Sequence, residues 1–452
     1  MAKKLILLSL LLTLATVLLL GMTSCFGDDD TTADKTSAKP EITTKVQTTA
    51  KVTTIKPPVT TAPITTEEPL RATEGLVIVS NGDGTAKVTG LNNAEATELV
   101  IPEYSDLGDR VIEIAASAFM QNTKLTRVIL PKNVYTIGAN AFYGCTALVG
   151  ITFAEGLEFI QYGAFSDCSA LERLHFPATL TEVAPTAFSG CRALKLITVA
   201  EGGRTFRYEG NCLIRKADDT VVLGCSGSKI PKSAKAIADQ AFYNMGITEI
   251  LMPNSIVSIG KQAFGMNETL MALVLSESLE TLSDLAFYRC SALESVYLPK
   301  TLTAIGLAPF RGCTALTRLT VAQDNPAYRV ESLCLIEKET DRLVQGLKDS
   351  TIPASVRVIG KGAFSMIPVE ALTLPDGCLT VEAEAFANTY ALRELLLPAT
   401  LAEVHKTAFN HASALQNIHY EGSEEAFNAL MEGITLPEKV IVTFGEGSVV
   451  GE

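Results

Sequence analysis

The chain has 452 residues, of which 19% are charged and none is tryptophan, and its formal net charge is −13. This acidic balance, with no basic stripe in the sequence, argues against a nucleic-acid-binding protein; an acidic surface mainly favours solubility. At this length the chain could form two or three ordinary domains, although a stack of repeats needs no such division. The low aromatic content of 6% suits thin stacked coils better than a bulky globular core.

The N-terminus has the pattern of an export signal. Two lysines precede an apolar run over residues 5–20, which is short for a membrane-spanning helix. Small residues then lead to Cys25, in a pattern that resembles the lipobox of bacterial lipoproteins. We therefore predict a lipoprotein signal peptide over residues 1–24; the alternative is an ordinary cleaved signal and a chance cysteine. No second long apolar run follows. We therefore predict an exported protein that is anchored by lipid to the extracytoplasmic surface of the bacterial cell membrane.

A threonine- and proline-rich segment comes next. Residues 25–70 predict the lipidated cysteine and a disordered linker, because this composition has too little apolar surface to offset the entropy of ordering. The linker is interpreted either as a stalk that lifts the repeats from the membrane or as a plain spacer.

Residues 75–90 predict a β-hairpin. The turn at residues 81–84 reads Asn-Gly-Asp-Gly, and these residues supply the positive φ that tight hairpin turns need. A calcium loop is the alternative, but an EF-type loop has a glutamate at its twelfth position, where Asn92 stands.

A sequence motif that contains Ala-Phe then recurs about every 23 residues. Two longer steps of 54 residues interrupt this period, and the repeats from 188 to 287 map onto those from 310 to 409 by a constant shift of 122. A period of this size indicates coils that bury a shared core by stacking. Each coil predicts a short strand closed by proline, a weaker inward segment and one helical or 3₁₀ turn. The repeat phenylalanines, which predict a buried aromatic column, are Phe119, Phe142, Phe165, Phe188, Phe242, Phe264, Phe287, Phe310, Phe364, Phe386 and Phe409.

The repeated motif, A-F-x-x-C-x-x-L-x-x-I-x-L-P-x-x-L-x-x-I, resembles the BspA-type leucine-rich repeat of bacterial surface proteins, and the resemblance covers roughly residues 75–430. The resemblance implies a β-rich leucine-rich-repeat solenoid over residues 116–420. It also implies an N-terminal cap over residues 71–115 and a C-terminal cap and tail over residues 421–452. The function implied is cell-surface binding or adhesion, with no catalytic residue to assign.

Two matched insertions lie inside the repeats, at about residues 200–229 and 322–351. Both predict a hairpin, with turns near residues 218–219 and 340–341. An insertion of this kind either projects as a contact site or splices two sub-stacks together, and both interpretations are kept.

The cysteines divide into two groups. The first group lies three residues after a repeat phenylalanine, at a position that Asn122 or Asn267 occupies in other coils. We predict that these cysteines form an inward ladder of free thiols, because their Cβ vectors are parallel. They are Cys145, Cys168, Cys191, Cys290 and Cys313. Cys212 and Cys225 are instead symmetric about the predicted turn at residues 218–219, so a disulfide between them is possible.

No motif predicts chemistry. The sequence has no H-E-x-x-H, G-x-S-x-G, P-loop, G-x-G-x-x-G or C-x-x-C pattern, so we expect no enzyme, no cofactor and no metal site. His405, His411 and His419 occupy different positions within their coils and are interpreted as scattered surface histidines.

The candidate binding face consists of the strand positions that point away from the core, about eight and ten residues after each phenylalanine. Aliphatic, aromatic and arginine side chains there are typical of protein interfaces, although strand propensity alone also explains β-branched residues. The residues that we single out are Arg127, Ile129, Arg173, His175, Leu251, Val274, Tyr297, Arg318 and Leu396.

The predicted function is the binding of an extracellular protein ligand, as in adhesion to host or neighbouring cells. A structural envelope component or a glycan-binding module is the alternative. Glycans are expected to contact exposed aromatic rings, and the predicted face offers mainly Tyr297. An enzyme ranks third, because the pattern builds no cleft with converging ionisable groups.

Overall fold

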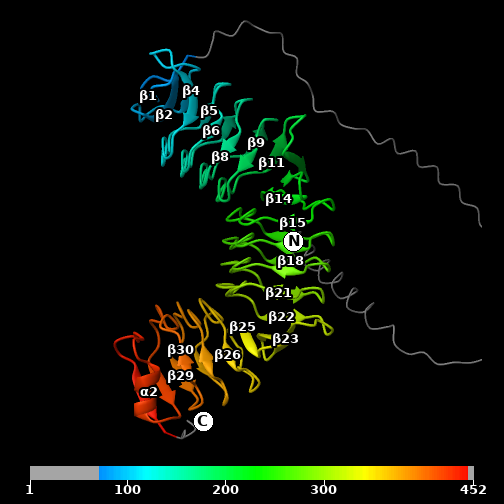
Figure 1. The fold of residues 1–452 in the computed structure, drawn as a ribbon, viewed down its shortest axis with the longest axis vertical. Coiled ribbons are helices and arrows are strands. Elements are labelled where there is room, and N and C mark those ends of the chain that lie inside the picture. Colours follow the sequence, from blue (N-terminus) through cyan, green and yellow to red (C-terminus); the bar gives the residue numbers. More distant parts are fainter. Residues whose placement is uncertain (1–70, 446–452) are drawn as a thin grey trace, which may run out of the picture. The chain divides into compact units, whose positions relative to one another are not determined.

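The computed structural model describes residues 71–445. In this part the chain winds into coils that follow one another in sequence order (Figure 1). The predicted signal peptide, Cys25 and the linker up to residue 70 lie outside the described residues, as do residues 446–452. No helix between residues 71 and 445 is long and apolar enough to cross a bilayer.

Each regular coil supplies a strand to the outer ladder, which contains the strands that come after the repeat phenylalanine. Neighbouring strands pair in parallel with a spacing of one coil, as in Arg127 opposite Gly150. The outer ladder has three segments, the last of which ends in the C-terminal cap. They are β3 (Glu98–Val100), β5 (Arg127–Ile129), β7 (Gly150–Thr152), β9 (Arg173–Phe176) and β11 (Leu196–Val199); β16 (Glu249–Leu251), β18 (Ala272–Val274), β20 (Ser295–Leu298) and β22 (Arg318–Val321); and β27 (Ala371–Thr373), β29 (Glu394–Leu397), β31 (Asn417–Tyr420) and β32 (Ile441–Phe444).

A second parallel ladder runs along another side of the coils. Its strands are mostly two residues long, because each coil turns again at once. They are β4 (Arg110–Ile114), β6 (Thr136–Ile137), β8 (Phe159–Ile160) and β10 (Glu182–Val183); β15 (Ala236–Ile237), β17 (Ser258–Ile259), β19 (Thr281–Leu282) and β21 (Ala304–Ile305); and β26 (Val358–Ile359), β28 (Thr380–Val381) and β30 (Glu403–Val404).

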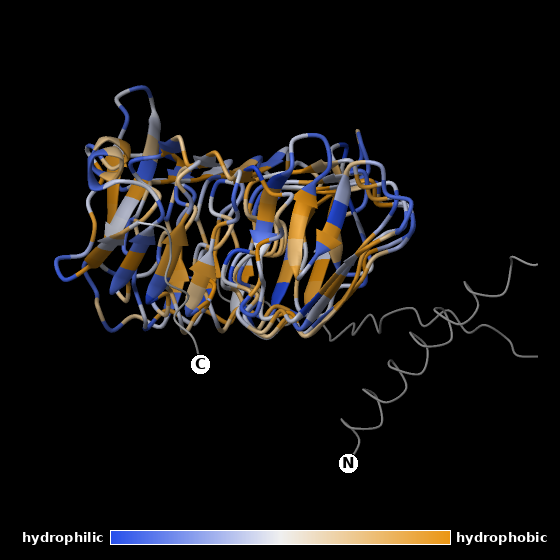
Figure 2. Ribbon diagram, turned by 90° about the horizontal axis from the view of Figure 1, so that it is seen from below, coloured by the Kyte–Doolittle hydropathy of each residue, from blue (hydrophilic) through white to orange (hydrophobic). Residues whose placement is uncertain are grey.

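The eleven repeat phenylalanines are buried, as predicted, and they stack in three columns. The columns run from Phe119 to Phe188, from Phe242 to Phe310 and from Phe364 to Phe409, and we call the corresponding coils blocks 1, 2 and 3. Within a column, neighbouring ring centroids lie 5.0–5.9 Å apart, and the rings are near parallel. Stacked pairs of this kind add about 0.5–1.5 kcal/mol each beyond the burial of apolar area. Several strands correspondingly alternate between hydrophobic and hydrophilic residues along their length (Figure 2).

The segment around each phenylalanine is a chain of turns, and here the prediction of a helical or 3₁₀ turn is wrong in detail. At every ring except Phe409, the residues two before and two after the ring have positive φ, as Asn140 (56°) and Gly144 (70°) do around Phe142. Alternate amides therefore point in opposite directions. Tyr143 donates within its own coil, to the Asn140 carbonyl, while Phe142 donates to Ala164 of the next coil at 2.8 Å. This arrangement makes a third ladder of hydrogen bonds between coils.

In most coils the inward position three residues after the ring holds a side chain that forms hydrogen bonds, as predicted; Met245, Ile367 and Ala412 are apolar exceptions. Each cysteine there donates from its thiol to the phenylalanine carbonyl of the preceding coil, as Cys168 does to Phe142 at 3.1 Å. Asn267 does the same with its amide, donating to Phe242 at 2.8 Å. Its side-chain oxygen also accepts from the Ile247 amide at 3.1 Å. A small thiol and an amide thus satisfy the same buried carbonyl.

Both ends of the stack are closed. At the start, β1 (Leu76–Ser80) and β2 (Thr85–Leu91) form the predicted antiparallel hairpin, and β2 then pairs in parallel with β4. At the end, helix α2 (Glu424–Leu430) is capped by Ser423, whose hydroxyl accepts from the Ala426 amide. Its buried Phe427 packs on Tyr420 with centroids 5.6 Å apart, so the last coil does not leave its core open to water.

Each insertion forms three antiparallel strands, whereas the sequence predicted a single hairpin. The strands are β12 (Phe206–Glu209), β13 (Cys212–Arg215) and β14 (Thr220–Leu223) in the first copy, and β23 (Tyr328–Glu331), β24 (Cys334–Glu337) and β25 (Arg342–Gly346) in the second. The additional turn has two central residues of positive φ: Gly210 and Asn211 in one copy, Ser332 and Leu333 in the other. The last strand of each insertion pairs in parallel with the second ladder of the next block. The insertions therefore splice blocks together.

The same charged network fastens both insertions. Arg207 donates to Asp219 at 2.9 Å and to Ser233 at 3.1 Å. In the second copy, 122 residues later, Arg329 makes the equivalent bonds to Asp341 at 2.8 Å and to Ser355 at 2.9 Å. Each copy of the duplicated sequence thus contains all the residues of the arginine network that holds its insertion.

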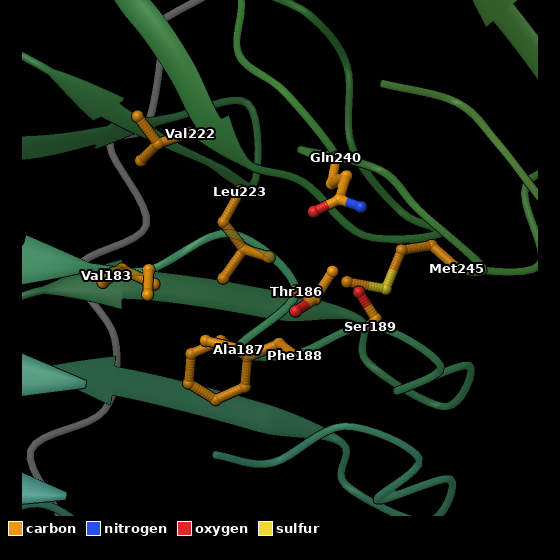
Figure 3. A pocket seen from close by; sticks show the side chains of 10 residues that line it. Val183, Thr186, Ala187, Phe188, Ser189, Val222, Leu223, Gln240 and Met245 are labelled. Carbon is orange, nitrogen blue, oxygen red and sulfur yellow. The ribbon is translucent and has the colours of Figure 1, made fainter. Parts of the chain in front are cut away.

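The aromatic column is interrupted at each splice. A Cβ atom added to Gly224, directly after β14, would collide with the ring of Phe242, and one on Gly346 would collide with Phe364. The end of the inserted strand therefore lies against the first ring of the new column. Next to the first splice is a cavity of about 10 Å³, lined in part by Phe188, Leu223 and Met245 (Figure 3). Its size is close to that of one water molecule.

Candidate binding face

The nine residues of the candidate binding face all lie on outer-ladder strands, distributed over its three segments. Arg127, Ile129, Arg173 and His175 belong to the first segment. Leu251, Val274, Tyr297 and Arg318 belong to the second, and Leu396 belongs to the third. Strand alternation turns them away from the core, since the residues between them are buried, as in the exposed-buried-exposed-buried pattern of β9.

The first segment is mainly polar. The Arg127 guanidinium lies 3.3 Å from the Glu98 carboxylate on β3, so its charge is partly compensated on the same face. His175 shares a hydrogen bond of 2.9 Å with the Thr198 hydroxyl on β11. Arg173, opposite Leu196, has no ion pair among the described residues.

The second segment carries an apolar row. Leu251 and Val274 are direct cross-strand neighbours, and they are 58% and 37% exposed. Tyr297 on the next strand is 49% exposed and lies opposite Thr320. Partial burial, with the carboxylates of Glu277 and Asp324, raises the pKa of the Tyr297 phenol, which therefore remains a neutral hydrogen-bond donor at physiological pH.

Arg318 on β22 is the last residue of this row. It lies opposite Ser295 on β20, and its guanidinium has no ion pair within residues 71–445. One further exposed side chain was missed by the sequence analysis: Met271, 54% exposed, which directly precedes β18. Met271 lies seven residues after Phe264, outside the two rows that alternation predicts. Nothing else in the sequence marks it as an exposed residue of the face.

The third segment is more covered. Leu396 is half-buried between Thr373 and His419, its partners on β27 and β31. His419 in turn shares a hydrogen bond of 2.8 Å with Thr443 on β32. Ile441, also on β32, is strongly exposed and was not predicted, because the repeat pattern fades in the C-terminal cap.

The remaining predicted site residues are placed as follows. Cys212 and Cys225 are free and buried, and no bridge joins them in the structure. The predicted symmetry about residues 218–219 does not hold, because the register between β13 and β14 shifts between Leu213 and Ile214. Burial raises the pKa of the Cys212 thiol to about 12. Within residues 71–445, no group of three histidine, cysteine or acidic side chains is placed to hold a metal ion.

Several solved bacterial structures are similar to the chain. One is a leucine rich cell surface protein from Faecalibacterium prausnitzii A2-165, at 20% identity and a TM-score of 0.38, covering 81% of this chain and 98% of that one. The pneumococcal vaccine antigen PcpA has 16% identity and a TM-score of 0.38, covering 83% and 93%. A leucine-rich repeat protein from Eubacterium ventriosum ATCC 27560 has 16% identity and a TM-score of 0.43, covering 84% and 95%.

No curated protein matches the chain. The family model of the BspA type leucine rich repeat region, which has six copies of the repeat, matches residues 109–211, 224–330 and 343–441. These matches cover more than half of the chain, and the two gaps between them, residues 212–223 and 331–342, lie within the three-stranded insertions. The chain belongs to the family of BspA-type leucine-rich-repeat proteins.

Proposed function

We propose that the chain is an exported, lipid-anchored surface protein whose repeat stack binds an extracellular protein ligand through the outer ladder. Membership of a family of repeat surface proteins supports a binding scaffold rather than an enzyme. The lipid anchor rests on the sequence pattern that ends at Cys25. The binding role rests on the apolar row of the second segment.

That row is unusual for a surface that faces only water. Leu251, Val274 and Tyr297 occupy consecutive strands, and the exposed Met271 lies beside them at the start of β18. Contiguous exposed apolar surface of this kind marks interaction sites. The strands are held by the ladder on one side and by the packed core beneath, so the row is presented with little conformational entropy left to lose on binding.

The chemistry of the row fits a protein partner. An aromatic ring, aliphatic side chains and an unpaired arginine, Arg318, are the residue types that contribute most to protein interfaces. Tyr297 is the one aromatic residue among the nine of the candidate face, so stacking on sugar rings has little support there.

The experiment compares the whole chain with the variant Leu251→Asp/Tyr297→Ala, by surface plasmon resonance on a panel of extracellular matrix proteins and cell-wall glycans. Loss of two central contacts is expected to weaken protein binding at least about 30-fold. Leu107→Asp is the matched control, because Leu107 is apolar and highly exposed but lies in a loop of the N-terminal cap. Equal binding by the double variant and the wild type would refute the proposed face.

The anchor is tested separately. Cys25→Ala is expected to abolish incorporation of labelled fatty acid in a bacterial host and to move the protein out of the membrane fraction. Unchanged labelling would show that Cys25 is not the lipidated residue, and it would leave the binding face untouched.

A further inference from the structure

The two splices differ in their bridging side chains: at the first, Arg192 donates to the neutral amide of Asn244, whereas at the second, between Phe310 and Phe364, an arginine donates to a carboxylate. Arg311 follows the last ring of block 2, and its Nη1 donates to the Glu384 carboxylate of block 3 at 2.8 Å. Gly362, which has a φ of +66°, lines the cavity beside this bridge. Two blocks that are not continuous in sequence are thereby joined over a span of 73 residues.

A cavity of about 190 Å³ lies beside this bridge. Its charged lining consists of Lys261, Asp284, Arg311, Lys361 and Glu384. The cavity at the first splice is about 10 Å³ and its lining contains no charged side chain. Only the second splice therefore combines room for a small molecule with a set of ionic groups.

The two carboxylates of the lining already have donors. Asp284 accepts from the Leu307 amide at 2.7 Å, and Glu384 accepts from Arg311. The ammonium groups of Lys261 and Lys361 have no ion pair or hydrogen bond within residues 71–445. With three cationic and two anionic side chains, the lining has a net charge of +1.

Further donors in the same lining lack an acceptor. The Nε of Arg311 is buried without a hydrogen-bond partner, although its Nη1 is bonded. One coil earlier, Leu285 donates its amide to Leu307 at 2.9 Å, whereas the amide of Ala308 has no acceptor in the described part of the chain. A buried donor left unpaired has lost its hydrogen bond to water without a replacement, so such groups call for a ligand that accepts hydrogen bonds.

We propose that this cavity binds a small oxyanion. The Arg311 Nε and the two ammonium groups supply charge-assisted hydrogen bonds, and the guanidinium is held in place by its bond to Glu384. The ligand is a free anion or the anionic group of a larger partner, and phosphate, sulfate and carboxylate share the required chemistry. The cavity residues precede the repeat phenylalanine or follow it directly, so the site is independent of the outer-ladder face.

The test is calorimetric titration of the whole chain with inorganic phosphate, sulfate and acetate at low ionic strength. We expect binding that weakens at least about tenfold in Lys261→Gln/Lys361→Gln, because two charge-assisted contacts are lost. The ammonium groups of these lysines form no hydrogen bond or ion pair within residues 71–445, so the variant should fold. Lys406→Gln is the control: this lysine has the same position in its coil, three before Phe409, but does not line the cavity.

A preference for phosphate and sulfate over acetate would support a tetrahedral ligand, and a preference for acetate would support a carboxylate. The proposal is overturned if none of the three anions binds, or if Lys406→Gln weakens binding as much as the cavity double variant does. The latter result would mean that anions respond only to the general charge of the surface.

Discussion

The contact of Gly224 with Phe242 offers the sharpest test of how the blocks are joined. A Cβ atom on residue 224 would lie 2.5 Å from Cδ1 of the ring and closer still to the next two ring carbons, whereas ordinary contact begins at 3.4 Å. Either the ring or the inserted strand must move, and neither is a flexible side-chain end. We expect Gly224→Ala to cost about 3 kcal/mol, at the upper end of overpacking effects.

The assay is equilibrium unfolding in urea, followed by circular dichroism. Gly150→Ala is the matched control, because its Cβ would meet no atom within 4 Å. That change is expected to be neutral or mildly stabilising, by up to about 1 kcal/mol. Phe242→Leu should relieve part of the clash, so the double variant Gly224→Ala/Phe242→Leu should be more stable than the two single effects predict by addition. A Gly224→Ala protein as stable as the wild type would refute the packing of the splice.

Three further predictions concern the core and the second insertion. Asn267→Leu should cost about 3 kcal/mol in urea unfolding, because it leaves the Phe242 carbonyl and the Ile247 amide unpaired, while Asn267→Cys should cost less, since a thiol fills this position in other coils. Cys290 and Cys334 should be inert to Ellman's reagent at pH 8 in the folded protein and react on unfolding, since burial raises the pKa of each thiol to about 12; fast reaction of either thiol in the native protein would contradict this. Burial acts to raise the pKa of Glu382, but its bonds to Arg342 outweigh that effect and lower it below the usual 4.5. The stabilisation by Glu382 is thus complete above that value and lost as pH falls through the lowered one, so Glu382→Gln should be less stable than the wild type at pH 7 and equal to it at pH 2.

The repetitive part of the fold could be predicted because one residue type recurs at one position. The ring column, the inward thiol ladder and the outward strand rows all follow from the spacing of the phenylalanines. The hairpin at residues 75–90 was readable because Asn-Gly and Asp-Gly supply positive φ locally. In each case the signal lies within one coil or one turn.

The paired turns around each ring were not predictable in the same way. Their left-handed positions are occupied by residues as different as Gln262, Leu285, Arg289 and Glu384. At Gln262, Leu285 and Arg289 the strain is offset by a hydrogen bond from the amide to the next coil, which a local pattern cannot show. The additional turn of the insertion is similar, since Ser332 and Leu333 carry no turn signal although Gly210 and Asn211 do. The equivalence of the two copies, 122 residues apart, was the only clue.

The cavity at the second splice shows the same limit for sites. Arg311 and Glu384 are 73 residues apart, and neither stands at a position that the repeat pattern marks as functional. They meet because the inserted strands β23 to β25 start a new block, whose coils lie against the last coil of block 2. Such a site depends on which two coils the splice brings together.

Each of the three blocks begins with antiparallel strands. This shared start explains how a chain built from one repeated motif can interrupt its aromatic column twice and still keep its fold. Block 1 begins with the antiparallel pair β1 and β2, and blocks 2 and 3 begin with three antiparallel strands; each set ends in a strand that pairs in parallel with the next coil. A parallel ladder needs a first strand to define its register, and an antiparallel turn supplies one locally. Because each duplicated segment includes this starting unit and its arginine fastening, a block can be added without requiring any change in the block before it.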